Sequence, residues 1–335
     1  MDLKTLCDLN GASGDERAVR RALIDAAKPL CDSVRIDKMG NVIAFKKGKT
    51  GGRHLLFSAH MDEIGFIVTG ATEDGLLQFR PIGGVDPRVA VSKYVLVGEK
   101  QLKGVIGALA IHLQSAEDRK KVLGFDSLYI DIGAASKDEA LADCPLGSYV
   151  YYDSVFEPFG DGCAVGKALD DRVGCYNLLR ILKGTYGADV TCAFVVQEEV
   201  GTRGAMGAGF AAQADTAIVL EGTTAGDMGD VKKTSRVCEP GLGVAVSFMD
   251  NSSIADRALY KELLALAREK QIPCQVKRAA TGGNDAGAYQ RSKGGVRTCV
   301  LSVPCRYIHG PSSVIRLSDV EAQYFLAKAY AEEAK

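Results

Sequence analysis

Hydrophobic and polar positions divide the chain into segments of two textures. In the first, short apolar runs such as 55–59 and 190–196 alternate with segments whose apolar residues recur three or four positions apart, as at 175–182. Continuous apolar runs are typical of strands buried on both faces of an α/β sheet, and the wider spacing predicts amphipathic helices. Ser13 and Glu16 have the spacing of a capping box and are expected to begin the first long helix.

The second texture lies between about residues 66 and 158. There, short β-like runs alternate with Gly and Pro turns, and long amphipathic helices are scarce. This pattern is typical of a small β-rich domain. The sequence therefore predicts an α/β domain, residues 1–66 and 161–335, that is interrupted by an inserted β domain, residues 67–160.

Composition narrows the class of protein. Hydrophobic residues make up 47% of the 335 residues, charged residues make up 25%, and the net charge is −1. Neither nucleic acid nor a membrane is therefore an expected partner. The N-terminal residues lack the basic and apolar stretches of a signal peptide, and no apolar run reaches the ~18–20 residues of a membrane span. None of the ten cysteines sits in a CxxC pair, so we expect thiols in a soluble, cytoplasmic protein.

Candidate metal-binding residues begin at the end of the apolar run 55–59, which is followed by His60 and Asp62. An imidazole in that position can bind a metal while a carboxylate fixes its tautomer from behind. Taken alone, a His after a strand is more often structural. Asp170, just before the next helix, also has two interpretations, because Asp is a favoured helix cap and its two oxygens can also bridge two cations.

Two adjacent carboxylates, Glu198 and Glu199, follow the apolar strand 190–196. Neighbouring carboxylates repel each other and are costly to desolvate, so they need solvent or cations. One interpretation is a hydrated loop. The other is a division of roles, in which one carboxylate binds a metal and the other moves a proton.

Glu221 and His309 complete the set of candidates. Glu221 directly follows the predicted strand 216–220, and His309 comes shortly after the predicted strand 300–303. Each is unremarkable alone. Because nearly every plausible ligand comes just after an apolar strand, we expect them to share one rim of one sheet.

Five stretches of the sequence resemble the M42 peptidases, the group of glutamyl and deblocking aminopeptidases. They occur in the family order and span nearly the whole chain, and their combination is specific although no single one is. The stretches are Ser58-Ala59-His60-Met61-Asp62-Glu63-Ile64-Gly65, Ala168-Leu169-Asp170-Asp171-Arg172, Val196-Gln197-Glu198-Glu199-Val200-Gly201, Thr281-Gly282-Gly283-Asn284-Asp285-Ala286 and Arg306-Tyr307-Ile308-His309.

This resemblance implies a role for each candidate. Glu198 is implied as the general base, and Asp62 as the partner of His60. The cofactors would be two divalent metal ions per subunit, Zn or Co, with Mn as a further candidate. The implied ligands are His60, Asp170 and Glu221 for one ion and Asp170, Glu199 and His309 for the other, so that Asp170 bridges the two.

The chain departs from the family pattern at two positions. Glu221 stands where many members have Asp, and Asn284 stands where Thr is usual in the Gly-Gly-x-Asp-Ala motif. A Glu side chain reaches one methylene further than Asp and can still bind a metal. The Gly-Gly-x-Asp-Ala motif looks structural or substrate-facing, and no ligand role is carried over to it.

The resemblance also implies the fold, the activity and the partners. The fold would be an α/β metallopeptidase catalytic domain, with a mixed central sheet flanked by helices, interrupted by a small β-barrel-like domain for oligomerisation or as a lid. The activity would be removal of N-terminal residues from short peptides by metal-activated water. Members often form tetrahedral shells of twelve subunits, so a homo-oligomer, in the family form a tetrahedral dodecamer, is expected.

Three other functions share parts of this pattern. A dinuclear amidohydrolase acting on N-acyl amino acids would use the same ligands. A non-catalytic metal-binding scaffold is disfavoured by Glu198, because a storage site needs no free carboxylate beside its ligands. A glycosidase also uses paired carboxylates, but sequence neighbours are poor candidates for opposed roles, and the chain has no Trp for a sugar platform.

Overall fold

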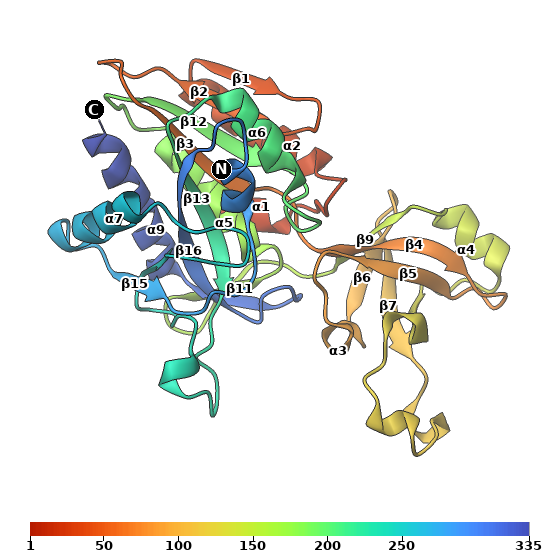
Figure 1. The fold of residues 1–335 in the computed structure, drawn as a ribbon. Helices are drawn as coiled ribbons and strands as arrows, with labels where there is room; N and C mark the ends of the chain where they lie inside the picture. Colours follow the sequence, from red (N-terminus) through yellow and green to blue (C-terminus); the bar gives the residue numbers. More distant parts are fainter. Residues whose placement is uncertain (335) are drawn as a thin grey trace.

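The computed structural model describes residues 1–334. It contains a large mixed sheet covered by helices and a smaller closed barrel (Figure 1). This is the fold class predicted from the sequence. The strands of the large sheet follow the order β1 (Ser33–Ile36), β2 (Val42–Lys46), β12 (Asp189–Val195), β3 (His54–His60), β13 (Thr216–Thr224), β16 (Arg297–Arg306), β17 (Ser313–Arg316), β11 (Cys163–Gly166) and β10 (Glu157–Phe159), with β14 (Val244–Ser247) pairing β16 and β15 (Cys274–Lys277) pairing β14.

Helices cover both faces of this sheet. Adjacent residues Leu55 and Leu56 of β3 belong to different hydrophobic clusters on its two faces. Both faces are therefore buried, which explains why the strand reads as an unbroken apolar run. The helices on one face are α2 (Arg17–Ala27), α5 (Leu169–Ile181), α7 (Arg257–Glu269) and α9 (Leu317–Glu333), and those on the other face are α6 (Arg203–Ala212) and α8 (Asp285–Gln290).

Shorter helices occupy the connections. Within residues 1–334, no helix is both long enough and apolar enough to cross a bilayer. The short α-helices are α1 (Leu3–Asp8), α3 (Pro87–Ala90) and α4 (Lys137–Asp143), and the 3₁₀ turns are η1 (Lys28–Leu30), η2 (Ile111–Leu113), η3 (Asp118–Lys120), η4 (Phe125–Ser127) and η5 (Lys233–Ser235).

The first long helix does not begin as predicted. Its N-cap is Glu16, whose side chain makes no capping hydrogen bond. The prediction of a capping box formed by Ser13 and Glu16 is therefore wrong. The Ser13 hydroxyl instead donates to the carboxylate of Asp62 at 2.6 Å, and Ser13 is itself buried. A buried carboxylate needs such donors, so a contact across the fold replaces the local cap.

The centre of the large sheet is parallel. Strand β3 pairs in parallel with β12 and β13, and β13 pairs in parallel with β16. The carboxyl ends of these four strands therefore meet at one edge of the sheet, which is the usual place for a site in an open α/β sheet.

The second body is a six-stranded closed barrel, drawn apart from the large sheet in Figure 1. Its centre contains Phe66, which packs edge to face against Phe79 and Tyr152. The domain limits given above stay a prediction. The strands, in barrel order, are β4 (Gly65–Ala71), β5 (Leu77–Ile82), β8 (Leu128–Asp131), β7 (Leu102–Ala108), β6 (Tyr94–Val97) and β9 (Tyr149–Tyr152).

Candidate metal centre and active-site cleft

The parallel strands bring the candidate residues to one edge of the sheet. His60 is the last residue of β3, and Glu198 and Glu199 follow β12. Glu221 lies inside β13 and not after it, because the strand continues to Thr224 by pairing with β16. The register of β13 against β3 still places Glu221 level with His60.

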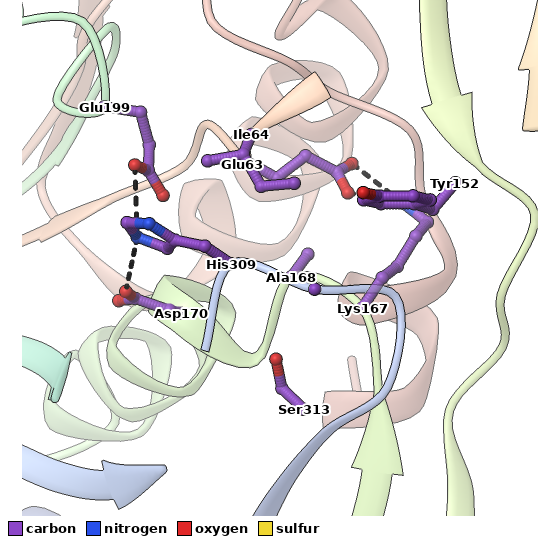
Figure 2. Close-up of a pocket in the computed structure, with 10 residues that line it drawn as sticks. Glu63, Ile64, Tyr152, Lys167, Ala168, Asp170, Glu199, His309 and Ser313 are labelled. Carbon is purple, nitrogen blue, oxygen red and sulfur yellow. Dashed lines mark hydrogen bonds and ion pairs between the residues drawn. The ribbon is translucent and has the colours of Figure 1, made fainter. Parts of the chain in front are cut away.

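Asp170 and His309 reach the same edge from connecting segments. The regular part of α5 begins after Asp171, whose carboxylate accepts from the backbone N–H of Gly174 as an N-cap does. Asp170 has non-helical backbone angles and does not cap the helix. Its Oδ1 lies 3.4 Å from Nε2 of His60, and its Oδ2 lies 3.7 Å from Nε2 of His309 (Figure 2 shows the His309 side). One carboxylate therefore faces both imidazoles.

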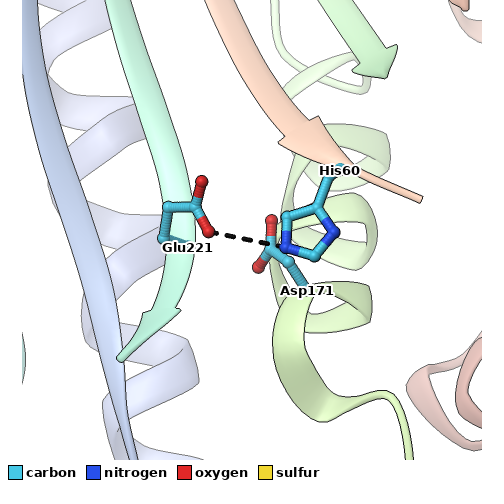
Figure 3. A group of neighbouring side chains, drawn as sticks. All are labelled: His60, Asp171 and Glu221. Atoms are coloured by element: carbon cyan, nitrogen blue, oxygen red, sulfur yellow. Dashed lines mark ion pairs between the residues drawn. The ribbon is translucent and has the colours of Figure 1, made fainter. Parts of the chain in front are cut away.

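The remaining carboxylates complete two groups around Asp170. Oε2 of Glu199 lies 3.3 Å from Nε2 of His309, and Oε2 of Glu221 lies 3.6 Å from Nε2 of His60 (Figures 2 and 3). Two ligand atoms that share a cation at about 2.0–2.2 Å lie roughly 3–4 Å apart. The separations in the structure fall within this range.

Asp171 is a candidate ligand for which no role was predicted from the sequence. It forms a group with His60 and Glu221 in which one potential ligand atom of each lies within 4.8 Å of the others, and His60 forms a second such group with Asp170 and Glu199 (Figure 3 shows the first). Oδ1 of Asp171 accepts from the backbone of Gly174. Its Oδ2 is buried and has no hydrogen-bond partner within residues 1–334.

In both histidines, Nδ1 lies at hydrogen-bond distance from a main-chain carbonyl oxygen, which orients the imidazole ring. Nδ1 of His60 lies 3.0 Å from the main-chain carbonyl oxygen of Asp62 and 3.5 Å from its carboxylate. Nδ1 of His309 lies 3.0 Å from the carbonyl oxygen of Gly84. An Nδ1–H that donates to a carbonyl leaves the Nε2 lone pair free for a metal.

Gly84 belongs to the segment between β5 and α3, so the inserted domain contributes to the centre. The contact to His309 comes from the main-chain carbonyl group of Gly84. Because every residue has such a group, the contact could not be predicted from the sequence. A Cβ added at Gly84 would lie 3.1 Å from Nδ1 of His309, tighter than ordinary van der Waals contact. This close approach of backbone to imidazole favours glycine.

The carboxylate of Asp62 organises the segment that follows β12. Its Oδ1 accepts from the backbone N–H of Glu198 at 3.1 Å, and its Oδ2 accepts from that of Glu199 at 3.2 Å. Burial raises the pKa of Asp62, but the neighbouring His60 imidazole, the Ser13 hydroxyl and the backbone N–H of Glu198 together hold it below its usual value. Asp62 therefore stays ionised and positions two neighbouring carboxylates.

Charge and burial fit divalent cations. Burial raises the pKa of Glu199 to about 7 and raises that of Glu221 well above its usual range. Oε1 of Glu221 is buried and, in the described part of the chain, has no hydrogen-bond partner. A cation removes both penalties, because it favours the ionised carboxylates and satisfies their oxygens. Imidazole and carboxylate together suit Zn, Co or Mn.

A buried ion pair between Lys167 and Glu63 connects the segment before Asp170 to the segment after His60. Nζ of Lys167 lies 2.7 and 2.9 Å from the two carboxylate oxygens of Glu63 (Figure 2). Arg172 donates to the carbonyl oxygen of Met61 at 2.9 Å and lies 3.4 Å from Glu63. All three charged side chains are buried. The chain on either side of Asp170 is thereby tied to the segment after His60.

The candidate centre opens into a cleft of about 550 Å³. Its walls include the metal-site residues, the ends of β13 and β15, and the loop 281–284. This volume suits a ligand of a few residues. The carboxylate of Glu198 lies in the wall and makes no side-chain hydrogen bond to any described residue.

The Gly-Gly-x-Asp-Ala motif begins α8. Asn284 is its N-cap, with the side-chain oxygen accepting from the backbone of Ala286 at 2.9 Å and the amide donating to Asp250 at 2.8 Å. Asn therefore serves as a cap here. Asp285 is buried with both carboxylate oxygens lacking partners among residues 1–334, and burial raises its pKa to about 7.

The sequence of the chain is similar to those of known aminopeptidases. The chain matches the family described as M42 glutamyl aminopeptidase over residues 40–326. It is 33% identical over 341 residues to a lysyl aminopeptidase of Pyrococcus furiosus, covering 99% of this chain and 96% of that protein.

The fold of the chain is also similar to solved structures of related peptidases. An aminopeptidase from the archaeon Desulfurococcus kamchatkensis matches with a TM-score of 0.95 at 33% identity, over 99% of this chain and 94% of that one. The Pyrococcus horikoshii TET1 peptidase, which assembles into a tetrahedron or a large octahedral shell, matches with a TM-score of 0.87 at 35% identity, over 99% and 98%.

Proposed function

Because this chain belongs to the M42 family and is thus a metal-dependent aminopeptidase, we propose that it works with two divalent cations and removes N-terminal residues from short peptides. The observation that carries the proposal is the bridging position of Asp170, whose two oxygens face two histidines on opposite sides. A single-ion site would not need this arrangement.

The distances support a division of the ligands into two sets. His60, Asp170 and Glu221 would hold one cation, and Asp170, Glu199 and His309 would hold the other. Asp171 lies close enough to His60 and Glu221 to serve the first ion as well. The mixed nitrogen and oxygen donors favour Zn or Co, with Mn as an alternative.

Glu198 is proposed as the general base. A pair of divalent cations, when bound, polarises the scissile carbonyl and lowers the pKa of a water molecule. Glu198 lies in the cleft wall outside both ligand sets, and Asp62 holds its backbone. Its carboxylate can take the proton from the attacking water and deliver it to the leaving amine.

A homo-oligomer in the cytoplasm is proposed as the working form. The related TET1 peptidase forms closed shells. On this chain, apolar side chains of the segment after β7 are exposed, including Leu109, Ile111 and Leu113. Exposed apolar patches of this kind mark contact surfaces, and a tetrahedral dodecamer would bury them. All ten cysteines are free thiols, as the cytoplasm would keep them.

Metal titration tests the proposal. Protein stripped with a chelator is titrated with Co²⁺ or Zn²⁺ while hydrolysis of a panel of aminoacyl-p-nitroanilides and N-acyl amino acids is followed. We expect hydrolysis of the aminoacyl substrates to return as metal approaches two equivalents per subunit. Full activity at one equivalent would refute the dinuclear site, and hydrolysis of N-acyl amino acids alone would replace the aminopeptidase with an amidohydrolase.

A further inference from the structure

Two buried amide side chains lie behind the candidate metal centre. Asn177 belongs to α5 and Gln323 to α9, and both are fully buried. The side-chain N–H of Asn177 donates to Oε1 of Gln323 at 2.9 Å. The amide of Gln323 in turn donates to the main-chain carbonyl oxygens of Glu221 at 3.1 Å and Leu301 at 2.8 Å. A helix that packs against the sheet therefore holds the backbone of a proposed metal ligand.

The direction of these hydrogen bonds is fixed by the groups at their two ends. The guanidinium of Arg180 can only donate, so the atom of Asn177 that lies 3.2 Å from it is the side-chain oxygen. The NH₂ group of Asn177 then faces Gln323. The NH₂ group of Gln323 faces the two main-chain carbonyl groups, which can only accept. Each amide thus donates to the next group inward.

The peptide group between Glu221 and Gly222 continues this series. Its carbonyl oxygen accepts from Gln323, and its N–H donates to Oδ1 of Asp170 at 3.1 Å. Because the C=O and N–H of a planar trans peptide point in opposite directions, this one group is held from two sides. Three amide groups in series therefore connect a guanidinium of α5 to the carboxylate of Asp170.

The sheet opens at this place. Strand β13 pairs with β3 as far as Val219, whereas its pairing with β16 continues to Thr224. His60, Asp170 and Glu221 meet beyond the point where β13 and β3 cease to pair. The sheet therefore supports the backbone of Glu221 on the β16 side only, and hydrogen bonds to side chains supply the rest of its support.

The series acts on one side of the candidate centre. Oε2 of Glu221 and Oδ1 of Asp170 lie 3.6 and 3.4 Å from Nε2 of His60 (Figure 3 shows Glu221 and His60). The other oxygen of Asp170 faces His309. Amide groups that donate in one direction polarise one another and favour the negative charge at the end of the series. The series therefore supports the ligands beside His60 more than those beside His309.

We propose that Gln323 is a positioning residue for the cation beside His60. It fixes the main chain of Glu221 and, through the peptide group, the carboxylate of Asp170, while the ligands beside His309 are held by other contacts. A Glu side chain has one more rotatable bond than Asp, so a fixed backbone narrows the positions that its carboxylate can take. This inference rests on the proposed pair of cations and adds that the two ions are controlled separately.

Metal affinity at each site, measured alone, tests the proposal. His309→Ala leaves the ligands on the His60 side, and His60→Ala leaves those on the other side. In each background, competition with a chromogenic chelator gives the affinity for Co²⁺ with and without Gln323→Leu. We expect Gln323→Leu to weaken binding about 10–100-fold in the His309→Ala protein and less than about twofold in the His60→Ala protein, since residues that hold a metal ligand usually have effects of the former size.

The two backgrounds keep this inference separate from the proposed function. They need no turnover, and each asks about one ion only. A wild type that binds a single ion would refute the dinuclear site, but the effect of Gln323→Leu on the His60 side would still be measured. Equal weakening in both backgrounds would assign Gln323 a general structural role and overturn the proposal, as would unchanged affinity in both.

A matched control removes a buried hydrogen bond far from the centre. Thr191 is buried in β12, near the other end of the parallel strands, and its hydroxyl lies 2.8 Å from Nε2 of His54. Thr191→Val keeps the shape of the side chain and loses this bond. It should leave the Co²⁺ affinity of both backgrounds unchanged. A loss as large as that in Gln323→Leu would show that any weakening of the sheet loosens the metal.

A milder variant answers the same question if Gln323→Leu does not fold. Arg180→Met removes the outer end of the series and keeps both buried amides. It should weaken Co²⁺ binding in the His309→Ala protein, by less than Gln323→Leu, and leave the His60→Ala protein unchanged. Glu321→Gln removes the salt-bridge partner of Arg180 without breaking the series and should bind as the parent does. Equal losses in Arg180→Met and Glu321→Gln would overturn the proposal, because the ion pair and not the series would then be responsible.

Discussion

The carboxylate of Asp62 accepts the backbone N–H of Glu198 at 3.1 Å, so the residue expected to orient His60 also fixes the proposed base. The same carboxylate accepts from the backbone of Glu199 and lies 3.5 Å from Nδ1 of His60. A single side chain therefore aligns one proposed ligand of each ion, His60 and Glu199, and the proposed base.

Asp62→Asn should weaken metal binding. The amide keeps the size of the side chain but offers one acceptor where two are used, so one backbone N–H loses its bond. We expect about 10–100-fold weaker affinity for metal, which is the usual effect of replacing a residue that hydrogen-bonds to a metal ligand. Competition with a chromogenic chelator measures this affinity. Ser13→Ala, which removes one bond to the same carboxylate, is the milder control. Unchanged affinity in Asp62→Asn would contradict the role assigned to Asp62.

Glu198→Gln should abolish turnover without releasing metal. The amide cannot accept a proton, and general acid–base catalysis typically contributes about 10²–10⁴-fold. Steady-state hydrolysis of an aminoacyl-p-nitroanilide gives the rate, and elemental analysis gives the metal content. A variant that keeps near-normal rates with two bound ions would show that another group is the base.

Lys167→Met should destabilise the protein strongly. It leaves the buried carboxylate of Glu63 without its closest cation, and breaking a buried pair costs about 3–5 kcal/mol. Urea unfolding followed by circular dichroism measures the loss. The double variant Glu63→Gln with Lys167→Met should recover part of it. Lys4→Met removes the exposed pair with Asp8 and should cost less than about 1 kcal/mol; equal losses in both single variants would refute the argument.

Asp285→Asn should stabilise the metal-free protein more at pH 8 than at pH 5. Burial raises the pKa of Asp285 to about 7 in the folded protein from 3.8. The unfolded chain therefore releases this proton first, and the folded state loses stability as pH rises from about 4 to about 7. Asn removes that penalty, so the gain should grow by about 3 kcal/mol between pH 5 and pH 8.

Urea unfolding at the two pH values measures this difference. Asp138→Asn is the matched control, since Asp138 also lies in the first turn of a helix but is exposed. It should show no comparable pH dependence. A gain for Asp285→Asn that is the same at both pH values would mean that the carboxyl group does not titrate differently on folding.

Much of the centre could be predicted because it follows from strands. His60, Glu198 and Glu199 each come at the end of an apolar run, and parallel strands place such residues at one edge. Periodicity and turn spacing predicted an α/β domain interrupted by a β-rich domain, whereas the mixed sheet and the barrel were expected only from the family resemblance. The family resemblance then supplied the roles, which the distances around Asp170 support.

Other features depend on contacts between distant segments and had no local signal. Glu221 lies inside β13 because pairing with β16 extends the strand, which an apolar pattern ending at Leu220 does not indicate. Asp171 is ordinary in sequence, and only its burial with one carboxylate oxygen that has no partner among the described residues distinguishes it. Ser13 had a plausible local cap role, but the buried carboxylate of Asp62 recruits it instead.

The carbonyl group of Gly84 has a consequence for how such proteins can evolve. If the barrel served assembly alone, it could be replaced by another barrel whose two ends join the catalytic domain at the same places, and the metal centre would be unaffected. Here the barrel's own backbone orients His309, so a transplanted barrel would have to return one peptide group to the same place. A change in the barrel is therefore expected to alter the position of His309 as well as any subunit contact, and a chimaera with a poorly matched barrel should show this first as weaker metal binding.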